Sequence, residues 1–92
     1  MSLLKAKTAV IENFESLKLK LDQAEDLGFI DTEEAYYNAM DTLLEDAKMA
    51  QSWDELAAVI DQGKTLEEDL DTWLSLKGFT TIGLQWPTSS AE

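Results

Sequence analysis

The sequence predicts an all-α protein, an antiparallel three-helix bundle followed by an extended C-terminal tail. Over most of the chain, apolar residues recur at intervals of three, four or seven, as they do along one face of a helix. Gly28 and Gly78 stand where two periodic stretches stop, the usual position of a helix-ending glycine. With 92 residues, the chain can enclose a single hydrophobic core. We expect the helical bundle domain to span residues 1–78 and the tail residues 79–92.

The first predicted helix extends from residue 3 to residue 27. At 1.5 Å per residue it reaches about 37 Å, which is long for a small monomer. Leu4 and Ile11 widen its apolar stripe on one side, so the stripe is broader than one neighbouring helix requires. This width motivates a prediction of homodimerisation, through the first two helices or through the tail. The stripe itself consists of Leu3, Val10, Phe14, Leu17, Leu21 and Ala24.

The second and third predicted helices begin at recognisable capping residues. Asp31 can cap free N–H groups at the start of the second helix. Ser52 and Glu55 have the spacing of a capping box before the third helix, which begins at Trp53. The predicted apolar faces are Tyr36, Ala39, Met40, Leu43, Leu44, Ala47 and Ala50, then Leu56, Val59, Ile60, Gly63, Leu66, Leu70, Trp73 and Leu74.

Gly63 leaves alternatives open for the third helix. Its apolar face keeps its phase as far as residue 76, which favours one continuous helix. Glycine costs about 1 kcal/mol relative to alanine in a helix interior, so a bend near Gly63 is one alternative. The other is a break, because Thr65 and Glu68 form a second capping box that could start a short fourth helix.

The tail has a different pattern. Ile82, Leu84 and Trp86 alternate with small or polar residues before Pro87, which is typical of an extended segment. No second strand is predicted for it to pair with. The tail must therefore pack on the helices, pair with a copy of itself or dock a partner, and the pattern does not choose among these. We expect its last residues to be disordered.

Missing residue types exclude much enzyme chemistry. The chain has no histidine and no cysteine, and all seven of its basic residues are lysine. Without histidine it lacks the commonest general base and transition-metal ligand. Without arginine it cannot clamp a phosphate through two parallel hydrogen bonds. We therefore predict a non-catalytic protein without a cofactor.

The charge is strongly negative and unevenly distributed. Nineteen acidic residues and seven lysines give a formal net charge of −12, and residues 29–92 hold fourteen of the acids with three lysines. Such a surface repels nucleic acid and anionic lipid and attracts basic proteins. We predict a basic protein partner and no direct binding of nucleic acid or membrane. The alternative is that the charge serves only solubility.

No membrane span or secretion signal is predicted. Spanning a bilayer takes about 20 consecutive apolar residues, and the apolar runs here are far shorter. The first residues lack the pattern of a secretory signal, so we expect a cytoplasmic location.

The leading interpretation is a small acidic interaction or regulatory protein of the inhibitor, adaptor or nucleic-acid-mimic type. Tyr37 and Trp86 lie off the predicted core faces, and exposed aromatic residues are enriched in binding hot spots. The acidic surface also includes Asp54, Glu67, Glu68, Asp69 and Asp71. The candidate partner-binding residues are Tyr37, Phe79, Ile82, Leu84, Trp86, Glu33, Glu34, Asp41, Glu45 and Asp46.

Two alternatives belong to other classes. Glu67, Glu68 and Asp71 have a spacing similar to that of the magnesium-binding acids of all-helical nucleotide pyrophosphohydrolases. The resemblance implies a magnesium-dependent hydrolase, which needs further acids on a neighbouring helix and cations to hold a triphosphate. The other alternative is a structural subunit of a larger assembly, whose wide apolar stripe is the functional surface.

Overall fold

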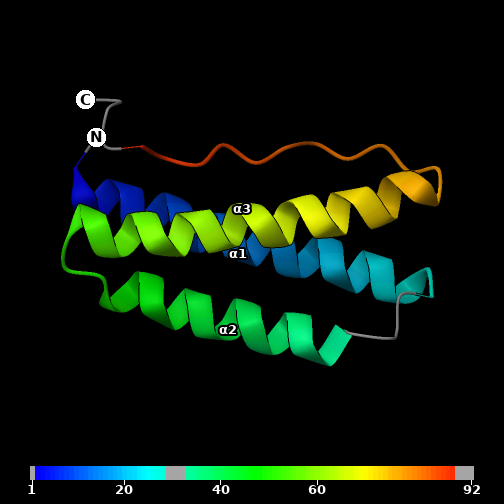
Figure 1. Cartoon of the computed structure of the whole chain (residues 1–92), viewed down its shortest axis with the longest axis horizontal. Helices are drawn as coiled ribbons and strands as arrows, with labels where there is room; N and C mark the ends of the chain where they lie inside the picture. The colour runs from blue at the N-terminus through cyan, green and yellow to red at the C-terminus, as the bar shows by residue number, and fades with distance from the viewer. Residues whose placement is uncertain (1, 29–32, 89–92) are drawn as a thin grey trace.

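The computed structural model describes residues 2–28 and 33–88. It contains three helices, α1 (Leu3–Asp26), α2 (Glu33–Met49) and α3 (Trp53–Leu76), and no strand among the described residues. Successive helices run in opposite directions, and residues 79–88 return along the bundle towards the end at which α1 begins (Figure 1). The predicted all-α three-helix bundle is thus confirmed. We call residues 79–88 the tail from here on.

The predicted glycine stops are confirmed. Gly28 has φ +98° and Gly78 has φ +88°, a region that residues with a Cβ rarely adopt. After α3 the N–H of Phe79 donates to Leu74 O at 3.0 Å and the N–H of Gly78 donates to Ser75 O at 3.0 Å. This pair of bonds is a Schellman motif. It turns the chain back, so the tail lies along the bundle.

The capping box of α3 forms with one difference from the expected pattern. Ser52 Oγ accepts the N–H of Glu55 at 3.2 Å, as predicted. The Glu55 carboxylate accepts the N–H of Gln51 at 2.8 Å, where the pattern predicts the N–H of Ser52. The cap predicted at Asp31 lies outside the described residues.

The α3 helix is continuous across Gly63, so the alternative of a break is wrong. The Thr65 hydroxyl donates to Asp61 O at 3.2 Å, a bond inside the helix that starts no new one. The buried face of α3 contains Glu67, which is 8% exposed, where the sequence suggested Leu66. Leu66 is half-buried at the edge of the core.

The core draws on all three helices and the tail. The wide stripe of α1 is used within one chain, because α1 contacts α2, α3 and the tail. Leu4, one of the residues that widened the stripe, is 75% exposed, whereas Ile11 packs against the core. Homodimerisation therefore stays a prediction, without the reason that motivated it. The largest fully buried side chains are Phe14, Leu17, Leu21, Met40, Leu56, Leu70, Leu74 and Val10.

The molecule measures 39 × 23 × 15 Å along its principal axes, and the long helices set the longest dimension. Among the described residues, no helix has the length and apolar character needed to cross a membrane.

Candidate protein-interaction site

The tail occupies the groove between α1 and α3. The indole ring of Trp86 packs edge-to-face on Phe14, with ring centroids 5.6 Å apart. It also lies against Gly63, where an added Cβ would come within 2.7 Å of the ring. Asn13 on α1 donates its side-chain amide to Gln85 O at 2.8 Å. Gly63 is therefore explained by the close approach of Trp86.

Glu67 holds the tail through both carboxylate oxygens. Oε2 accepts the backbone N–H of Leu84 at 2.7 Å, and Oε1 accepts the indole N–H of Trp86 at 2.9 Å. Lys20 on α1 lies 3.6 Å from Oε2 of Glu67 and donates to Asp71 at 3.0 Å and to Ile82 O at 3.0 Å. One lysine thus links α1, α3 and the tail.

Two of the three acids whose spacing resembles that of metal ligands already have partners within the chain. Glu67 and Asp71 bind Lys20, and Glu67 also accepts two hydrogen bonds from the tail. Glu68 is exposed. Within residues 2–28 and 33–88, no group of three or more acidic side chains is arranged to hold a metal ion.

The tail candidates for partner contact separate into two pairs. Leu84 and Trp86 are half-buried and pack against the core, so the bundle itself engages them. Phe79 is 40% exposed and Ile82 is 83% exposed. These two remain accessible to another molecule.

Tyr37 also has partners inside the chain. Its hydroxyl donates to Asp22 and lies 3.2 Å from Oε2 of Glu25, both on α1. The hydrogen bond to Asp22 raises the pKa of Tyr37 above its ordinary value, and burial and the charges of the two carboxylates act in the same direction. The ring packs against the core, so Tyr37 joins α2 to α1.

The acids predicted on α2 differ in their surroundings. Asp41 forms an ion pair with Lys18 on α1, and Glu45 lies 3.5 Å from Lys48 on its own helix. Asp46 is exposed and forms no ion pair with another described residue. Glu33 and Glu34 begin α2, and their side chains lie outside what the structure describes.

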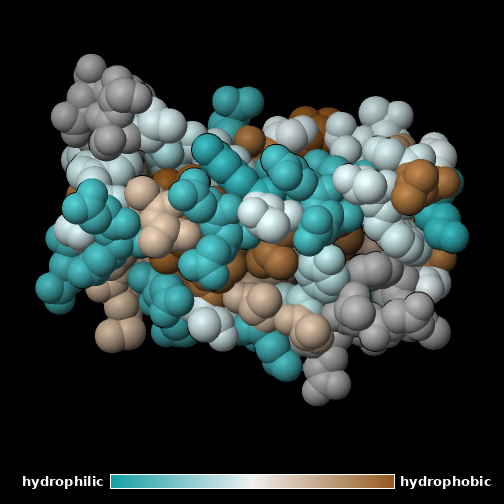
Figure 2. Space-filling model, viewed as in Figure 1, coloured by the Kyte–Doolittle hydropathy of each residue, from teal (hydrophilic) through white to brown (hydrophobic). Residues whose placement is uncertain are grey.

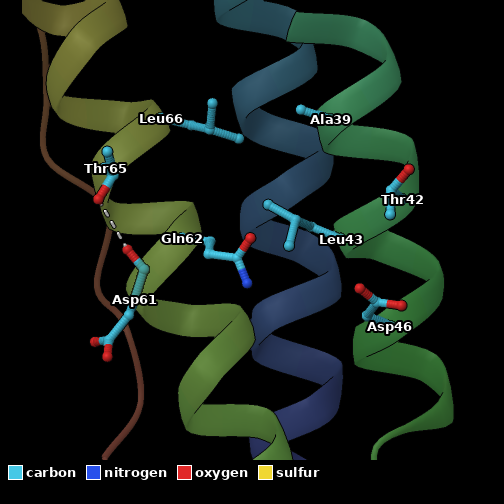
Figure 3. Close-up of a pocket in the computed structure, with 8 residues that line it drawn as sticks. All are labelled: Ala39, Thr42, Leu43, Asp46, Asp61, Gln62, Thr65 and Leu66. Atoms are coloured by element: carbon cyan, nitrogen blue, oxygen red, sulfur yellow. Dashed lines mark hydrogen bonds between the residues drawn. The ribbon is translucent and has the colours of Figure 1, made fainter.

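A groove of about 560 Å³ lies between α2 and α3. Leu43 and Leu66 point into the space between the two helices (Figure 3), and Ala39 completes an apolar floor. Asp46 stands on α2, and the carboxylate of Asp61 points away from α2 along the other side of α3. The groove therefore combines an apolar floor with one exposed acid from each of the two helices that form it.

The acids are concentrated on the two helices that form this groove. The α2 and α3 helices carry twelve acidic residues and two lysines, whereas α1 carries five acids and four lysines. Figure 2 shows the face formed by α3 and α2, where hydrophilic side chains predominate and hydrophobic ones are visible between them. The negative charge of the chain is thus concentrated on two of its three helices.

Comparisons with protein-family models, with curated proteins and with solved structures each find no match.

Sequence reasoning missed the roles of Lys20, Gly63 and Glu67. A usable signal was present, because Gly63 and Glu67 keep the helical phase of the buried Leu70 and Leu74. A glycine and a carboxylate on an otherwise apolar face indicate a close approach and a buried polar partner. Their partner, Trp86, could not be assigned because no local pattern relates the tail to α3.

Proposed function

We propose that the chain is a non-catalytic interaction protein whose acidic α2–α3 face binds a basic partner protein. The observation that carries the proposal is that the open groove lies between the two helices that carry most of the acidic residues. Twelve acids lie on the helices that also enclose the apolar-floored groove, and only two lysines accompany them. The inhibitor, adaptor and nucleic-acid-mimic types all fall within this proposal.

The mechanism is electrostatic attraction followed by burial of apolar surface. An excess of one sign of charge raises the rate of encounter with an oppositely charged partner, and salt weakens this effect over about 8–10 Å at physiological ionic strength. Exposed charge pairs add little affinity one by one. The groove floor supplies the apolar surface that holds the partner once it has arrived.

Several acids of the face are available for this role. Asp46 and Asp61 form no ion pair with another described residue, so binding a cation does not require breaking an existing pair. Glu67 and Asp71 pair with Lys20, Glu67 also binds the tail, and Asp41 pairs with Lys18. The proposal therefore rests on the exposed, unpaired acids and not on net charge alone.

A retention experiment tests the proposal. The immobilised protein is exposed at low salt to nuclease-treated lysate of its source cells. A variant with Asp46→Asn, Asp61→Asn and Glu68→Gln is compared with a matched variant with Glu12→Gln, Glu15→Gln and Asp26→Asn. All six residues are exposed, and both variants lose the same charge.

We expect one or a few basic proteins to be retained by the wild type and by the α1 variant, to elute as salt is raised, and to be lost from the α2–α3 variant. Equal retention by the two variants would mean that binding follows net charge and not this face. Retention that salt does not weaken would argue against an electrostatic mechanism.

No described geometry favours the hydrolase alternative, because Glu67 and Asp71 are engaged by Lys20. The structural-subunit alternative has no specific observation in its support, since the apolar stripe of α1 is covered within the chain.

A further inference from the structure

The three grooves between the helices differ in how they are filled. The tail covers the groove between α1 and α3. The ion pair of Lys18 with Asp41 and the hydroxyl of Tyr37 bridge α1 and α2. A hydrogen bond between the Tyr36 hydroxyl and Asp69 also joins α2 and α3, but the groove between these two helices stays open over about 560 Å³. Its floor is apolar and is open to solvent.

The lined part of the groove is short. On α2 it extends from Ala39 to Asp46, which is two helical turns or about 10 Å. On α3 it extends from Asp61 to Leu66. A partner helix places side chains along one face at intervals of three and four residues, so two turns of floor match two or three apolar anchors.

We infer that the α2–α3 groove binds an amphipathic helix of the partner, with a short apolar stripe flanked by lysine or arginine residues. The inference rests on the proposed function, since it names the part of the basic partner that the acidic face receives.

The polar groups of the groove favour a helix over an extended segment. In the α1–α3 groove, the extended tail has side-chain partners for its peptide groups, because Asn13 donates to Gln85 O, Lys20 donates to Ile82 O and Glu67 accepts the N–H of Leu84. An extended segment seated elsewhere would need similar partners.

Two of the polar side chains that line the α2–α3 groove already use their donors within α3. The Thr65 hydroxyl donates to Asp61 O at 3.2 Å, and the Gln62 amide donates to Ala58 O at 3.4 Å, both within α3. A helix satisfies its own peptide groups and presents only side chains. It can therefore cover an apolar floor without needing donors or acceptors there.

The acids that line the groove favour basic residues on both sides of the apolar stripe of the partner helix. Asp46 and Asp61 line the groove, one on each helix, with the Asp61 carboxylate directed away from α2, and neither forms an ion pair with another described residue. Long basic side chains on both sides of a central apolar stripe can reach these carboxylates while their alkyl stems cover apolar surface. An acidic helix would meet like charge in the same positions.

The test uses the full chain and a synthetic probe. The probe is a leucine–lysine peptide of about 18 residues with its leucines on one helical face, long enough to form a helix when bound. A second peptide has the same composition in scrambled order, so that its leucines surround the helix. Binding is followed by amide chemical shifts of the labelled protein at low and at high salt.

We expect the patterned peptide to shift resonances of groove residues on α2 and α3, to bind at least about tenfold more tightly than the scrambled peptide, and to weaken with salt. Two variants localise the contact. Gln62→Trp fills the groove without changing charge and should weaken binding about tenfold. Asp46→Lys with Asp61→Lys should weaken it at least about fivefold more than the control pair Glu12→Lys with Glu15→Lys.

The outcomes separate this inference from the function on which it rests. Equal binding of the two peptides, or no effect of Gln62→Trp, overturns the groove inference and leaves the acidic face as a diffuse site. Absence of binding by either peptide at low salt overturns both. Groove shifts that depend on protein concentration without any peptide show that a second copy of the chain fills the groove, which also overturns the inference. Unchanged α1 resonances in Gln62→Trp establish that the variant is folded.

Discussion

The indole nitrogen of Trp86 lies 2.9 Å from Oε1 of Glu67, so an aromatic residue of the tail is bonded to a carboxylate on the buried face of α3. The other oxygen of the same carboxylate accepts the N–H of Leu84 at 2.7 Å. A residue that resembles a surface acid or a metal ligand in the sequence thus acts as the attachment point of the tail.

Glu67→Gln should destabilise the protein by about 1–2 kcal/mol, because the amide oxygen can accept only part of what the carboxylate accepts and the attraction to Lys20 is lost. Urea denaturation measures the change in the free energy of unfolding. The matched control is Glu68→Gln on the neighbouring exposed residue, for which we expect a change within about 0.5 kcal/mol. Equal effects of the two substitutions would contradict the role assigned to Glu67.

Gly63→Ala should be destabilising although alanine is the better helix former. The added Cβ would lie 2.7 Å from Cη2 of Trp86 and 2.9 Å from Cζ of Phe14, and both rings are packed. Overpacking costs about 1–3 kcal/mol against a gain in helix propensity of about 1 kcal/mol, so we expect a net loss. Thermal unfolding followed by circular dichroism checks the sign.

A double-mutant cycle attributes that loss to the tail. In a Trp86→Ala background the ring that the new Cβ meets is absent, and Phe14 has space to move, so Gly63→Ala should cost less there. Additive effects of the two substitutions would show that the tail does not lie against Gly63. Gly83→Ala is the control, because no atom lies within 4 Å of its added Cβ.

Tyr37 should ionise above the ordinary tyrosine pKa of 10.0, because its hydroxyl donates to Asp22 and lies next to Glu25. The folded state then holds the phenolic proton more tightly than the unfolded chain does. The resulting stability is present below about pH 10 and is lost as the pH rises further.

The chemical shift of the Tyr37 Cζ carbon over a pH titration measures this ionisation. Asp22→Asn removes the charge and should lower the pKa towards its usual value, whereas Glu12→Gln should not change it. We also expect stability to fall more steeply above pH 10 in the wild type than in Tyr37→Phe. A Tyr37 resonance that titrates at the ordinary value would refute the contact.

Ser52→Ala should destabilise the protein by about 1 kcal/mol, since Ser52 Oγ accepts the N–H of Glu55 at the start of α3. Guanidinium denaturation measures the loss. Ser75→Ala, an exposed serine in the last turn of the same helix, is expected to change stability by less than about 0.5 kcal/mol. An equal loss of stability in Ser75→Ala would show that the effect does not come from the cap at Ser52.

The helices and their ends could be predicted because the responsible interactions are local. The Ser52 cap joins residues three apart, and Gly78 ends α3 through bonds to the turn before it. The same local reasoning failed at Glu67, because it assigned an acid to solvent by its residue type although Glu67 lies on the buried face of α3. Phase along the helix was the better guide there.

The acidic α2–α3 face was only partly predictable. The excess of acids in residues 29–92 was evident from composition. Which acids are free depends on pairings across helices, such as that of Asp41 with Lys18, and these require the packing of α1 against α2. The groove itself, with Leu43 from one helix and Leu66 from another, has no signature in either segment.

Local chemistry in the chain was sufficient for the three helices, their order and their antiparallel arrangement, because capping, periodicity and glycine stops act within a few residues. The position of the tail, in contrast, depends on tertiary contacts that no local pattern predicts. Asn13 and Gln85 are 72 residues apart, and Lys20 and Ile82 are 62 apart, yet each pair is hydrogen-bonded. Such contacts exist only after α1 and α3 have packed side by side, since that packing creates the groove into which Trp86 fits.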